Sequence, residues 1–457
     1  MYNSKLHFHF TGIGGSGMSG IAEILLNLGF KVSGSDQKSS AVSKRLESLG
    51  AEIFYGHSGK NIPEGASLLV YSSAINFSNC EIIEAQRRGL PIIRRAEVLA
   101  ELMRLKYGVG VAGSHGKTTT TSMTGAILEK GGLDPTVIIG GVVKSMGSGG
   151  RLGKGDYLVA ETDESDRSFL LLKPTIAVVT NIDAEHLQAY SSLKELEESF
   201  GQFIAAVPFY GLAVLCIDDH KVRDLAAAYK RRKVTYGFSL DADLRAENIV
   251  LNRSKASYDV LRQGEFLCHI DLPLPGRHMA LNSLAAIAVG LEFGLPVSVI
   301  QEALNGFGGV KRRIEVIGEV GGITLISDYA HHPSEIKATL RAVREGWQGS
   351  LRKLRVVFQP HRYSRTRDCF VEFIDAFSDC DELLLTEIYS AGEPTLEGIT
   401  GQVLCDAISK PKPRFVGELS TVDLRALTDL DCGDVVVCMG AGSVGALAED
   451  LLSQLSR

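Results

Sequence analysis

The segment Gly113–Thr118 has the residue types and spacing of a loop that binds a nucleoside triphosphate. It reads Gly-Ser-His-Gly-Lys-Thr and follows the apolar run Gly108–Ala112, which predicts a buried strand. Glycines let backbone N–H groups converge on phosphate oxygens at the N-terminus of the next helix. Lys117 would neutralise the β- and γ-phosphates, and the Thr118 hydroxyl would reach Mg2+. Val111 stands where the first glycine of the general pattern is usual. We expect the nucleotide to contact Gly113, Ser114, His115, Gly116, Lys117, Thr118 and Thr119.

An ordinary turn between a strand and a helix could also contain glycine and lysine. The four consecutive threonines Thr118–Thr121 count against that alternative, because β-branched residues form helices poorly and local propensity is overridden here. We therefore favour a phosphate-binding loop.

Metal-ligating residue types follow two further predicted strands. Glu161 ends one apolar run, and the segment Asn181–His186 follows the run Ile176–Thr180. The carboxyl ends of strands in an open α/β sheet are where ligands bind. Carboxylate and imidazole groups there suit Mg2+ beside phosphate, so Thr118, Glu161 and His186 are the predicted metal ligands. Two solvated acidic loops are the alternative, and each segment alone is a weak signal.

A second glycine-rich loop, Gly12–Gly17, reads Gly-Ile-Gly-Gly-Ser-Gly. It follows the predicted strand Leu6–Phe10, and Asp36 ends the next strand about 20 residues further on. This fingerprint of a dinucleotide-binding domain keeps an NAD-dependent oxidoreductase open as a rival. The same geometry binds any pyrophosphate, including that of a UDP-sugar. Because the chain also carries a separate ATP-binding loop, we favour a second nucleotide diphosphate here.

Two arginines after the predicted strand Leu354–Phe358 could hold a carboxylate. Arg362 and Arg365 are three residues apart and would share a face if a helix begins there. Guanidinium groups grip an amino-acid carboxylate bidentately and leave its amine free to attack. A solvated basic turn that includes His361 and Arg367 is the alternative, but the position after the carboxyl end of a strand favours a binding site.

Apolar runs alternate with helical patterns along the whole chain, which predicts βαβ units and parallel sheets. The pattern restarts twice, so we expect an α/β protein of three domains. Residues 1–106 would form a Rossmann-like domain, 107–310 a P-loop ATPase domain with a β-rich stretch at 233–272, and 311–457 a second Rossmann-like domain. The predicted strands are Leu6–Phe10, Lys31–Ser35, Leu68–Tyr71, Pro91–Ile93, Gly108–Ala112, Tyr157–Glu161, Ile176–Thr180, Leu212–Ile217, Ile323–Ser327, Leu354–Phe358, Glu382–Leu385 and Asp434–Met439. The predicted helices are Met18–Leu28, Ala41–Leu49, Cys80–Arg88, Lys117–Lys130, Leu193–Val207 and Met279–Phe293.

The composition is that of a globular protein, since 45% of the 457 residues are hydrophobic and 22% are charged. A net charge of −6 without a basic stripe gives no reason to expect nucleic acid. There is no signal-peptide pattern and no apolar run of bilayer length. The eight cysteines include no Cys-x-x-Cys pair, which favours reduced thiols over disulfides or a zinc site. We expect a cytoplasmic protein without membrane insertion, either a monomer or a weak dimer.

Segments spread over almost the whole chain resemble the Mur ligase family. Besides the phosphate loop they are Thr11–Ile21, Gly34–Asp36, Tyr71–Ile75, Glu161–Phe169, Val179–Tyr190, Val207–Asp219, Leu274–Asn282, Lys311–Arg313, Asp328–Glu335 and Phe358–Asp368. The segments Asp328–Glu335 (DYAHHPSE) and Phe358–Asp368 (FQPHRYSRTRD) are the specific ones, and they are similar to those of the branch that adds L-alanine. A cousin that attaches a ready-made tripeptide ordinarily lacks the full Arg-Tyr-x-Arg-Thr-Arg run, so it ranks second.

The resemblance implies an ATP-dependent amide ligase of peptidoglycan precursor synthesis that uses Mg2+. Its substrates would be UDP-N-acetylmuramate and L-alanine. ATP would phosphorylate the lactyl carboxylate, and the amine of L-alanine would displace phosphate from the acyl phosphate. The family pattern places one Mg2+ on Thr118 and Glu161 and a second on Glu161 and His186.

The resemblance also assigns roles to further residues. It places adenine at His278 and Asn282, the ribose at Asp328 and the γ-phosphate at Arg313. The catalytic residues that it implies are Lys117, His186, His332, Arg362 and Arg365. The substrate-binding residues that it implies are Gly12, Gly14, Gly15, Ser16, Gly17, Met18, Ser35, Asp36, Ser72, Tyr329, Arg362 and Arg365.

The chain departs from the family pattern at four positions near these segments. Ser327 replaces an acid, Ala330 a glycine, Ser334 a threonine and Met279 an asparagine. These small changes lie beside the site and leave the reaction class as it is, and the sequence does not say how they change the positioning of nucleotide and amino acid.

Overall fold

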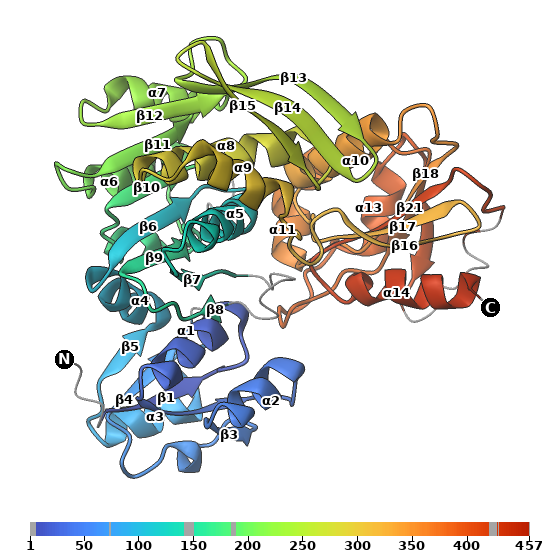
Figure 1. Cartoon of the computed structure of the whole chain (residues 1–457). Coiled ribbons are helices and arrows are strands. Elements are labelled where there is room, and N and C mark those ends of the chain that lie inside the picture. Colours follow the sequence, from blue (N-terminus) through green and yellow to red (C-terminus); the bar gives the residue numbers. More distant parts are fainter. Residues whose placement is uncertain are drawn as a thin grey trace. The chain divides into compact units, whose positions relative to one another are not determined.

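The computed structural model describes residues 6–72, 75–140, 150–183, 189–419, 427 and 429–456 (Figure 1). The chain divides into two compact units. The first consists of Met1–Glu247, Asp259–Ile270 and Leu281–Gly308, and the second of Asn248–Tyr258, Asp271–Ala280 and Gly309–Arg457.

The first unit begins with a five-stranded parallel sheet in the order β3-β2-β1-β4-β5. Its strands are β1 (His7–Thr11), β2 (Lys31–Asp36), β3 (Glu52–Tyr55), β4 (Leu68–Tyr71) and β5 (Ile92–Arg94). The connecting helices are α1 (Ser16–Asn27), α2 (Ala41–Ser48), α3 (Cys80–Arg87) and α4 (Arg95–Arg104). β1 is buried along its whole length, as expected for the central strand of a sheet that helices cover.

A ten-stranded sheet follows, in the order β15-β14-β13-β12-β11-β10-β6-β9-β7-β8. Its first strands are β6 (Tyr107–Ala112), β7 (Thr136–Ile138), β8 (Gly150–Arg151), β9 (Tyr157–Glu161), β10 (Ile176–Val179) and β11 (Leu212–Cys216). The β-rich stretch consists of β12 (Lys233–Gly237), β13 (Leu244–Asn252), β14 (Lys255–Arg262) and β15 (Glu265–Leu272). The helices of this part of the chain are α5 (Lys117–Lys130), α6 (Leu193–Ala205), α7 (His220–Ala228), α8 (Arg277–Glu292) and α9 (Val297–Asn305). β6 pairs in parallel with both β9 and β10, so the carboxyl ends of three strands meet at one edge (Figure 1).

The second unit contains a six-stranded sheet in the order β16-β17-β21-β18-β19-β20. Only the hairpin of β16 and β17 is antiparallel among its described pairs. The strands are β16 (Glu315–Val320), β17 (Ile323–Asp328), β18 (Leu354–Phe358), β19 (Glu382–Thr386), β20 (Arg414–Gly417) and β21 (Val435–Met439). The helices are α10 (Pro333–Gly346), α11 (Tyr363–Asp368), α12 (Phe370–Ile374), α13 (Gly401–Ala407) and α14 (Val444–Leu455).

The predicted α/β class with parallel sheets is confirmed, and every predicted strand and helix is present with ends that differ by at most two residues. The sequence patterns miss short or half-exposed elements such as β3, β7, β16 and α9. β3 has four residues and β16 has six, no residue in either strand is fully buried, and neither strand shows a clear alternation of apolar and polar residues. The domain boundaries at 106 and 310 stay a prediction.

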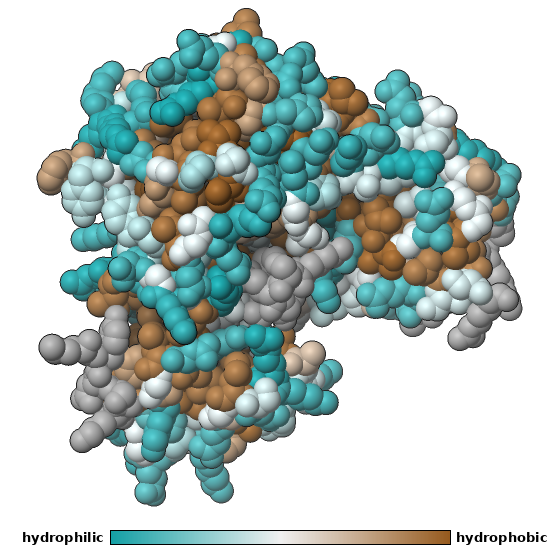
Figure 2. Space-filling model, in the orientation of Figure 1, coloured by the Kyte–Doolittle hydropathy of each residue, from teal (hydrophilic) through white to brown (hydrophobic). Residues whose placement is uncertain are grey.

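No helix in the described part of the chain has the length and apolarity to cross a membrane. On the face drawn in Figure 2, hydrophilic residues cover much of the surface and hydrophobic residues appear in separate groups between them. Scattered apolar surface of this kind is ordinary for globular proteins.

Candidate active site

The phosphate loop lies between the end of β6 at Ala112 and the start of α5 at Lys117. Gly113 has a φ of +135° and Gly116 a φ of +82°, which L side chains rarely adopt. A Cβ at Gly113 would collide with Oγ1 of Thr180, and a Cβ at Gly116 would lie 2.5 Å from Oδ1 of Asn282. Both glycines are therefore required by backbone conformation and by space.

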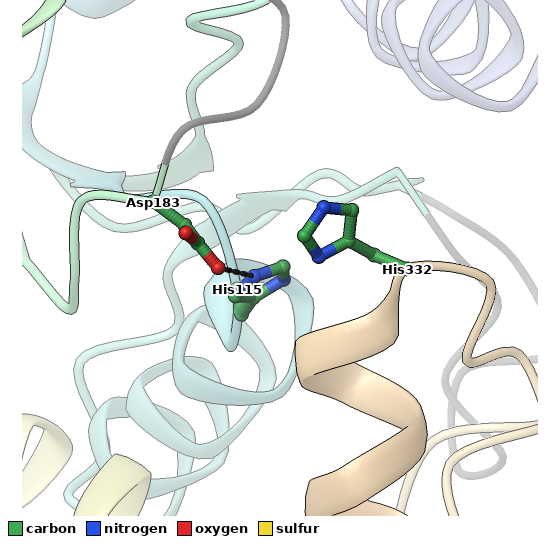
Figure 3. A group of neighbouring side chains, drawn as sticks. All are labelled: His115, Asp183 and His332. Atoms are coloured by element: carbon green, nitrogen blue, oxygen red, sulfur yellow. Dashed lines mark hydrogen bonds and ion pairs between the residues drawn. The ribbon is translucent and has the colours of Figure 1, made fainter. Parts of the chain in front are cut away.

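The residues that follow β10 hold the phosphate loop in place. The side chain of Asn181 accepts a hydrogen bond from the N–H of His115 at 2.8 Å and donates one to its carbonyl at 3.1 Å. The N–H of Asp183 donates to Oγ of Ser114 at 2.8 Å, and Nε2 of His115 lies 3.3 Å from Oδ2 of Asp183 (Figure 3). Asn181 and Asp183 thus fix the loop from a neighbouring strand, a role that the sequence reading did not assign to them.

The Lys117 side chain is 15% exposed, and its ammonium group lies within its own loop. Nζ donates to the carbonyls of Gly113 and Ser114 and to Oε1 of Glu164, the last at 2.9 Å. Burial acts to lower the pKa of Lys117, but Glu164 and then Glu161 outweigh it, and the pKa is raised above its ordinary value. Burial raises the pKa of Glu164 to about 7, although the charge of Lys117 opposes this. Glu164 was not among the predicted site residues, because its burial follows from packing and not from its neighbours in the chain.

Thr118 and Glu161 come together at the start of α5 and the end of β9. The Thr118 hydroxyl donates to Oε2 of Glu161 at 3.0 Å, and the N–H of Gly140 donates to the same oxygen at 2.7 Å. A hydroxyl and a carboxylate beside a phosphate loop are the oxygen ligands that Mg2+ prefers, so these two residues fit a magnesium site. His186, the third predicted ligand, lies outside the described residues.

Helix α8 carries both residues that the family resemblance places at adenine. His278 and Asn282 are four residues apart and therefore on one side of the helix. The side-chain amide of Asn282 lies against Gly116, the last residue of the phosphate loop before α5. Burial lowers the pKa of His278 to about 4, so the imidazole is neutral at pH 7.

The first glycine loop connects β1 to α1, and Asp36 at the end of β2 holds it. The N–H of Gly14 donates to Oδ2 of Asp36 at 2.8 Å, and a Cβ on Gly14 would lie 2.7 Å from that oxygen. The N–H of Gln37 donates to Oδ1 of Asp36 at 2.7 Å. Gly12 has a φ of +80°. Asp36 therefore shapes the loop through backbone hydrogen bonds.

Other predicted residues of this loop differ in exposure and contacts. The Met18 side chain is 2% exposed and packs in the core of the first sheet. Ser35 is buried at the end of β2, where its hydroxyl donates to Glu81 at 2.6 Å. The remaining predicted residues, Gly15, Ser16, Gly17 and Ser72, lie at the carboxyl edge of this sheet, with Ser16 starting α1 and Ser72 following β4.

Arg95, at the start of α4, is a candidate that the sequence reading missed. Its guanidinium lies against Gly17, because a Cβ on that glycine would collide with Nη1, and Nη2 donates to Oδ2 of Asp163 at 3.4 Å. Arg95 therefore connects the first glycine loop with the acidic segment after β9. A cavity of about 340 Å³ beside it is lined by Tyr71, Ile75, Asn76, Phe77, Arg94, Arg95, Ala96 and Asp166.

Glu81 is a second missed residue and lies fully buried in the first turn of α3. Oε2 accepts hydrogen bonds from the hydroxyls of Thr11 at 2.9 Å and Ser35 at 2.6 Å, and Oε1 accepts one from Asn61 at 2.8 Å. Burial alone would raise the pKa of Glu81, but the hydrogen bonds from His9, Ser35 and Asn61 prevail and lower it to about 2. The carboxylate ties together the ends of β1 and β2, next to the first glycine loop.

In the second unit, Asp328 at the end of β17 uses both carboxylate oxygens within the protein. Oδ2 accepts from the N–H of Ile314 at 2.6 Å, and Oδ1 accepts from the N–H of Ala330 at 2.8 Å and the hydroxyl of Thr339 at 3.2 Å. Burial raises the pKa of Asp328. Its visible role is to hold the segment before β16 against the end of β17, and its contact with a ribose stays a prediction.

Two neighbouring arginines, Arg312 and Arg313, contact the ring of Tyr329. The guanidinium carbons of Arg312 and Arg313 are 4.9 and 5.3 Å from the centre of its ring, a cation–π geometry. Arg312 donates to the carbonyls of Gly440 and Gly442, and Nη1 of Arg313 lies 3.6 Å from Glu335. The segment that carries Arg313 is thus fixed to the turn before α14.

His332 is the N-cap of α10, and Figure 3 shows it at the N-terminal end of that helix. Its Nδ1 accepts a hydrogen bond from the N–H of Ser334 at 3.4 Å, and Glu335 accepts from the N–H of His331 at 3.0 Å. Partial burial lowers the pKa of the adjacent His331 to about 3.

Helix α11 begins at Tyr363, so Arg362 lies one residue before the helix. Arg362 and Arg365 therefore do not share a helical face. Arg362 precedes the helix with a φ of +72°, a strained conformation for a residue other than glycine, and its N–H donates to the carbonyl of Tyr389 at 2.8 Å. Arg365 lies within α11, with Nη1 3.3 Å from Nδ1 of His361. The His361 ring stacks on the ring of Tyr389, with 5.6 Å between the ring centroids. Burial lowers the pKa of His361 to about 4, and the positive charge of Arg365 is the second cause of this shift. Strain of this kind is concentrated at functional sites.

Three family models together cover most of the chain. The Mur ligase family catalytic domain matches residues 7–107, the Mur ligase middle domain residues 111–290, and the Mur ligase glutamate ligase domain residues 312–442.

Relatives and solved structures agree with these matches. The UDP-N-acetylmuramate–L-alanine ligase of Geobacter sp. (strain M21) is 51% identical over 100% of this chain and 99% of its own, and that of Desulfosudis oleivorans is 50% identical over 100% of both. The crystal structure of UDP-N-acetylmuramate-alanine ligase from Thermotoga maritima has a TM-score of 0.84 at 28% identity and covers 99% of each chain. A murein peptide ligase from Psychrobacter arcticus shares the fold, with a TM-score of 0.73 at 24% identity over 99% of each chain. The chain belongs to the Mur ligase family.

Proposed function

We propose that this chain joins L-alanine to the lactyl carboxylate of UDP-N-acetylmuramate, with conversion of ATP to ADP and phosphate, in peptidoglycan precursor synthesis. The observation that carries the proposal is the phosphate loop with Lys117 and the Thr118–Glu161 contact beside it. This geometry occurs in a chain that is about half identical, over its whole length, to proteins named for that reaction.

The proposed chemistry has two steps. A carboxylate oxygen attacks the γ-phosphorus of ATP, which gives an acyl phosphate and ADP. The amine nitrogen of L-alanine then attacks the carbonyl carbon, and phosphate leaves from the tetrahedral intermediate as the amide forms. Such steps need positioning and charge neutralisation more than covalent help from the protein. Lys117 would stabilise the charge on the transferring phosphoryl group.

Thr118 and Glu161 would hold one Mg2+, and Glu161 and His186 would hold a second. When bound there, the metal would neutralise phosphate oxygens and so favour attack by the negatively charged carboxylate. Asn282 and His278 would contact adenine, and Gly113–Thr119 would contact the phosphates.

The UDP-sugar would bind at the carboxyl edge of the first sheet. The N–H groups at the start of α1 and the open backbone of Gly12–Gly17 suit a pyrophosphate, and Asp36 fixes the shape of that loop. Ser35 and Ser72 lie at the same edge.

The second unit would bring the amino acid. Arg362 and Arg365 would grip the carboxylate of L-alanine, with Tyr329 and His332 nearby in the reacting complex. Arg313 would contact the γ-phosphate and Asp328 the ribose.

We also propose three functional domains, at 1–106, 107–310 and 311–457, and a cytoplasmic location, where ATP and UDP-sugars are made.

Phosphate release from ATP tests the proposed function most simply. We expect release only when UDP-N-acetylmuramate and L-alanine are both present, and the same assay with glycine and L-serine measures the selectivity for the amino acid. Faster release with the tripeptide than with L-alanine would assign the recycling reaction instead. No release, together with binding of NADH, would support an oxidoreductase.

A further inference from the structure

The ammonium group of Lys117 uses all three of its donors within the protein. Its three N–H donors match three acceptors, the carbonyls of Gly113 and Ser114 and Oε1 of Glu164. A phosphate oxygen can reach Lys117 only if at least one of these hydrogen bonds is given up. Glu164 is the one acceptor of the three that can ionise, and a charge-assisted contact with its carboxylate competes with a phosphate more strongly than a carbonyl does.

Glu164 cannot follow the lysine or turn to water. Its side chain is 2% exposed, and its backbone carbonyl is held by the hydroxyl of Tyr190 and by the N–H of Arg167. The second carboxylate oxygen, Oε2, is buried and has no hydrogen-bond partner among the described residues. Lys117 is therefore the only cation that the described residues bring within hydrogen-bonding distance of this carboxylate.

The other carboxylates around Lys117 are already engaged. Glu161 accepts from Thr118 and Gly140, and Asp163 accepts from Ser165 and Arg95. Glu164 differs from both, because Lys117 is the only side chain of the described residues that donates a hydrogen bond to its carboxylate.

We propose that Glu164 is the resting counter-ion of Lys117, which it holds in the nucleotide-free enzyme and releases to the triphosphate. This inference rests on ATP binding at the phosphate loop, as proposed above. Glu164 acts through Lys117 as a positioning residue. It holds the lysine inside the loop before ATP arrives, and the cost of breaking the pair weakens ATP binding.

The variant Glu164→Gln tests the inference, because glutamine keeps the shape and an acceptor oxygen but removes the competing charge. We expect this variant to bind a non-hydrolysable ATP analogue about tenfold more tightly than the wild type, which corresponds to roughly 1.4 kcal/mol of binding free energy. Binding of AMP should stay unchanged, because AMP lacks the β- and γ-phosphates that Lys117 contacts. Isothermal titration calorimetry on the full-length protein measures both affinities.

A matched control is Glu195→Gln, which removes a carboxylate that pairs with Arg167 in the same unit and does not contact Lys117. Its affinity for the ATP analogue should equal that of the wild type. Glu164→Asp, in which the carboxylate is withdrawn by one methylene, should bind with an affinity between those of the wild type and the glutamine variant. The thermal melting temperature shows whether Glu164→Gln folds. If it does not fold, Glu164→Asp is used in its place to test the inference.

Weaker or unchanged binding of the ATP analogue by Glu164→Gln would overturn the inference, because Glu164 would then orient Lys117 towards the phosphates or not affect it. Equal tightening for AMP and the ATP analogue would overturn it as well. If the wild type itself binds no ATP analogue, the proposed function fails. If the wild type binds and only the expected tightening is missing, this inference alone fails.

Discussion

At the scale of single residues, Lys117 is the group on which phosphoryl transfer depends most directly. Substitution Lys117→Ala removes the cation that faces the β- and γ-phosphates, so we expect phosphate release to fall by about 100-fold or more, the usual effect of losing one electrostatic group at a transition state. Lys130→Ala, at the other end of α5, is the control, since Lys130 pairs with Glu302 and is half exposed. Equal rates of phosphate release by Lys117→Ala and the wild type would show that Lys117 takes no part in phosphoryl transfer.

Arg365 provides a second test at this scale. Replacement by alanine should raise KM for L-alanine by roughly 30-fold or more, because a charge-assisted pair with a carboxylate contributes about 2–3 kcal/mol. KM for ATP should change little. The matched control is Arg367→Ala in the same helix, where the guanidinium is half exposed and pairs with the adjacent Asp368 at 2.7 Å. Steady-state kinetics with L-alanine as the varied substrate measures the difference, and a similar KM effect in both variants would rule out a specific role for Arg365.

At the scale of secondary-structure elements, the buried Glu81 ties β1 and β2 to α3. Its folded pKa of about 2 lies below the ordinary value near 4.5, so its contribution to stability is present above pH 4.5 and is lost as the pH falls towards 2. We expect Glu81→Gln to lower the unfolding free energy by roughly 3 kcal/mol at pH 7, with a difference from the wild type that shrinks below pH 4.5. Urea unfolding followed by circular dichroism between pH 3 and 7 measures this. Glu52→Gln, in the exposed edge strand β3, is the control, and a pH-independent difference for Glu81→Gln would contradict the argument.

Local patterns suffice to predict the elements that position the site, but not most of its contacts. The strand–loop–helix unit around Lys117 is predicted within one residue, because strand burial, glycines and the next helix are all adjacent in the chain. The pairing of Lys117 with Glu164 and of Gly17 with Arg95 joins residues 47 and 78 positions apart, and only packing determines it. The expected helical face of Arg362 and Arg365 differs from the structure for a related reason, since the carbonyl of Tyr389 holds Arg362 outside the helix in a conformation that spacing does not reveal.

At the scale of the whole molecule, the proposed reaction needs groups from both units. The phosphate loop and the UDP-sugar residues belong to the first unit, and Arg362 and Arg365 belong to the second. An acyl phosphate exposed to water would hydrolyse, so the site must close around it. We predict that residues 311–457 rotate towards the ATP-binding domain when ATP binds. Small-angle scattering should therefore give a smaller radius of gyration with nucleotide and UDP-N-acetylmuramate than without them, and identical profiles would count against closure.

In the proposed reaction, the phosphate loop delivers a phosphoryl group to a carboxylate. The most direct measurement uses UDP-N-acetylmuramate labelled with 18O in both oxygens of the lactyl carboxylate, together with ATP and L-alanine. If the carboxylate attacks ATP and phosphate later leaves from the acyl carbon, each released phosphate carries one 18O and the amide product keeps the other. Mass spectrometry should find this single label, whereas unlabelled phosphate formed together with the amide would contradict the account.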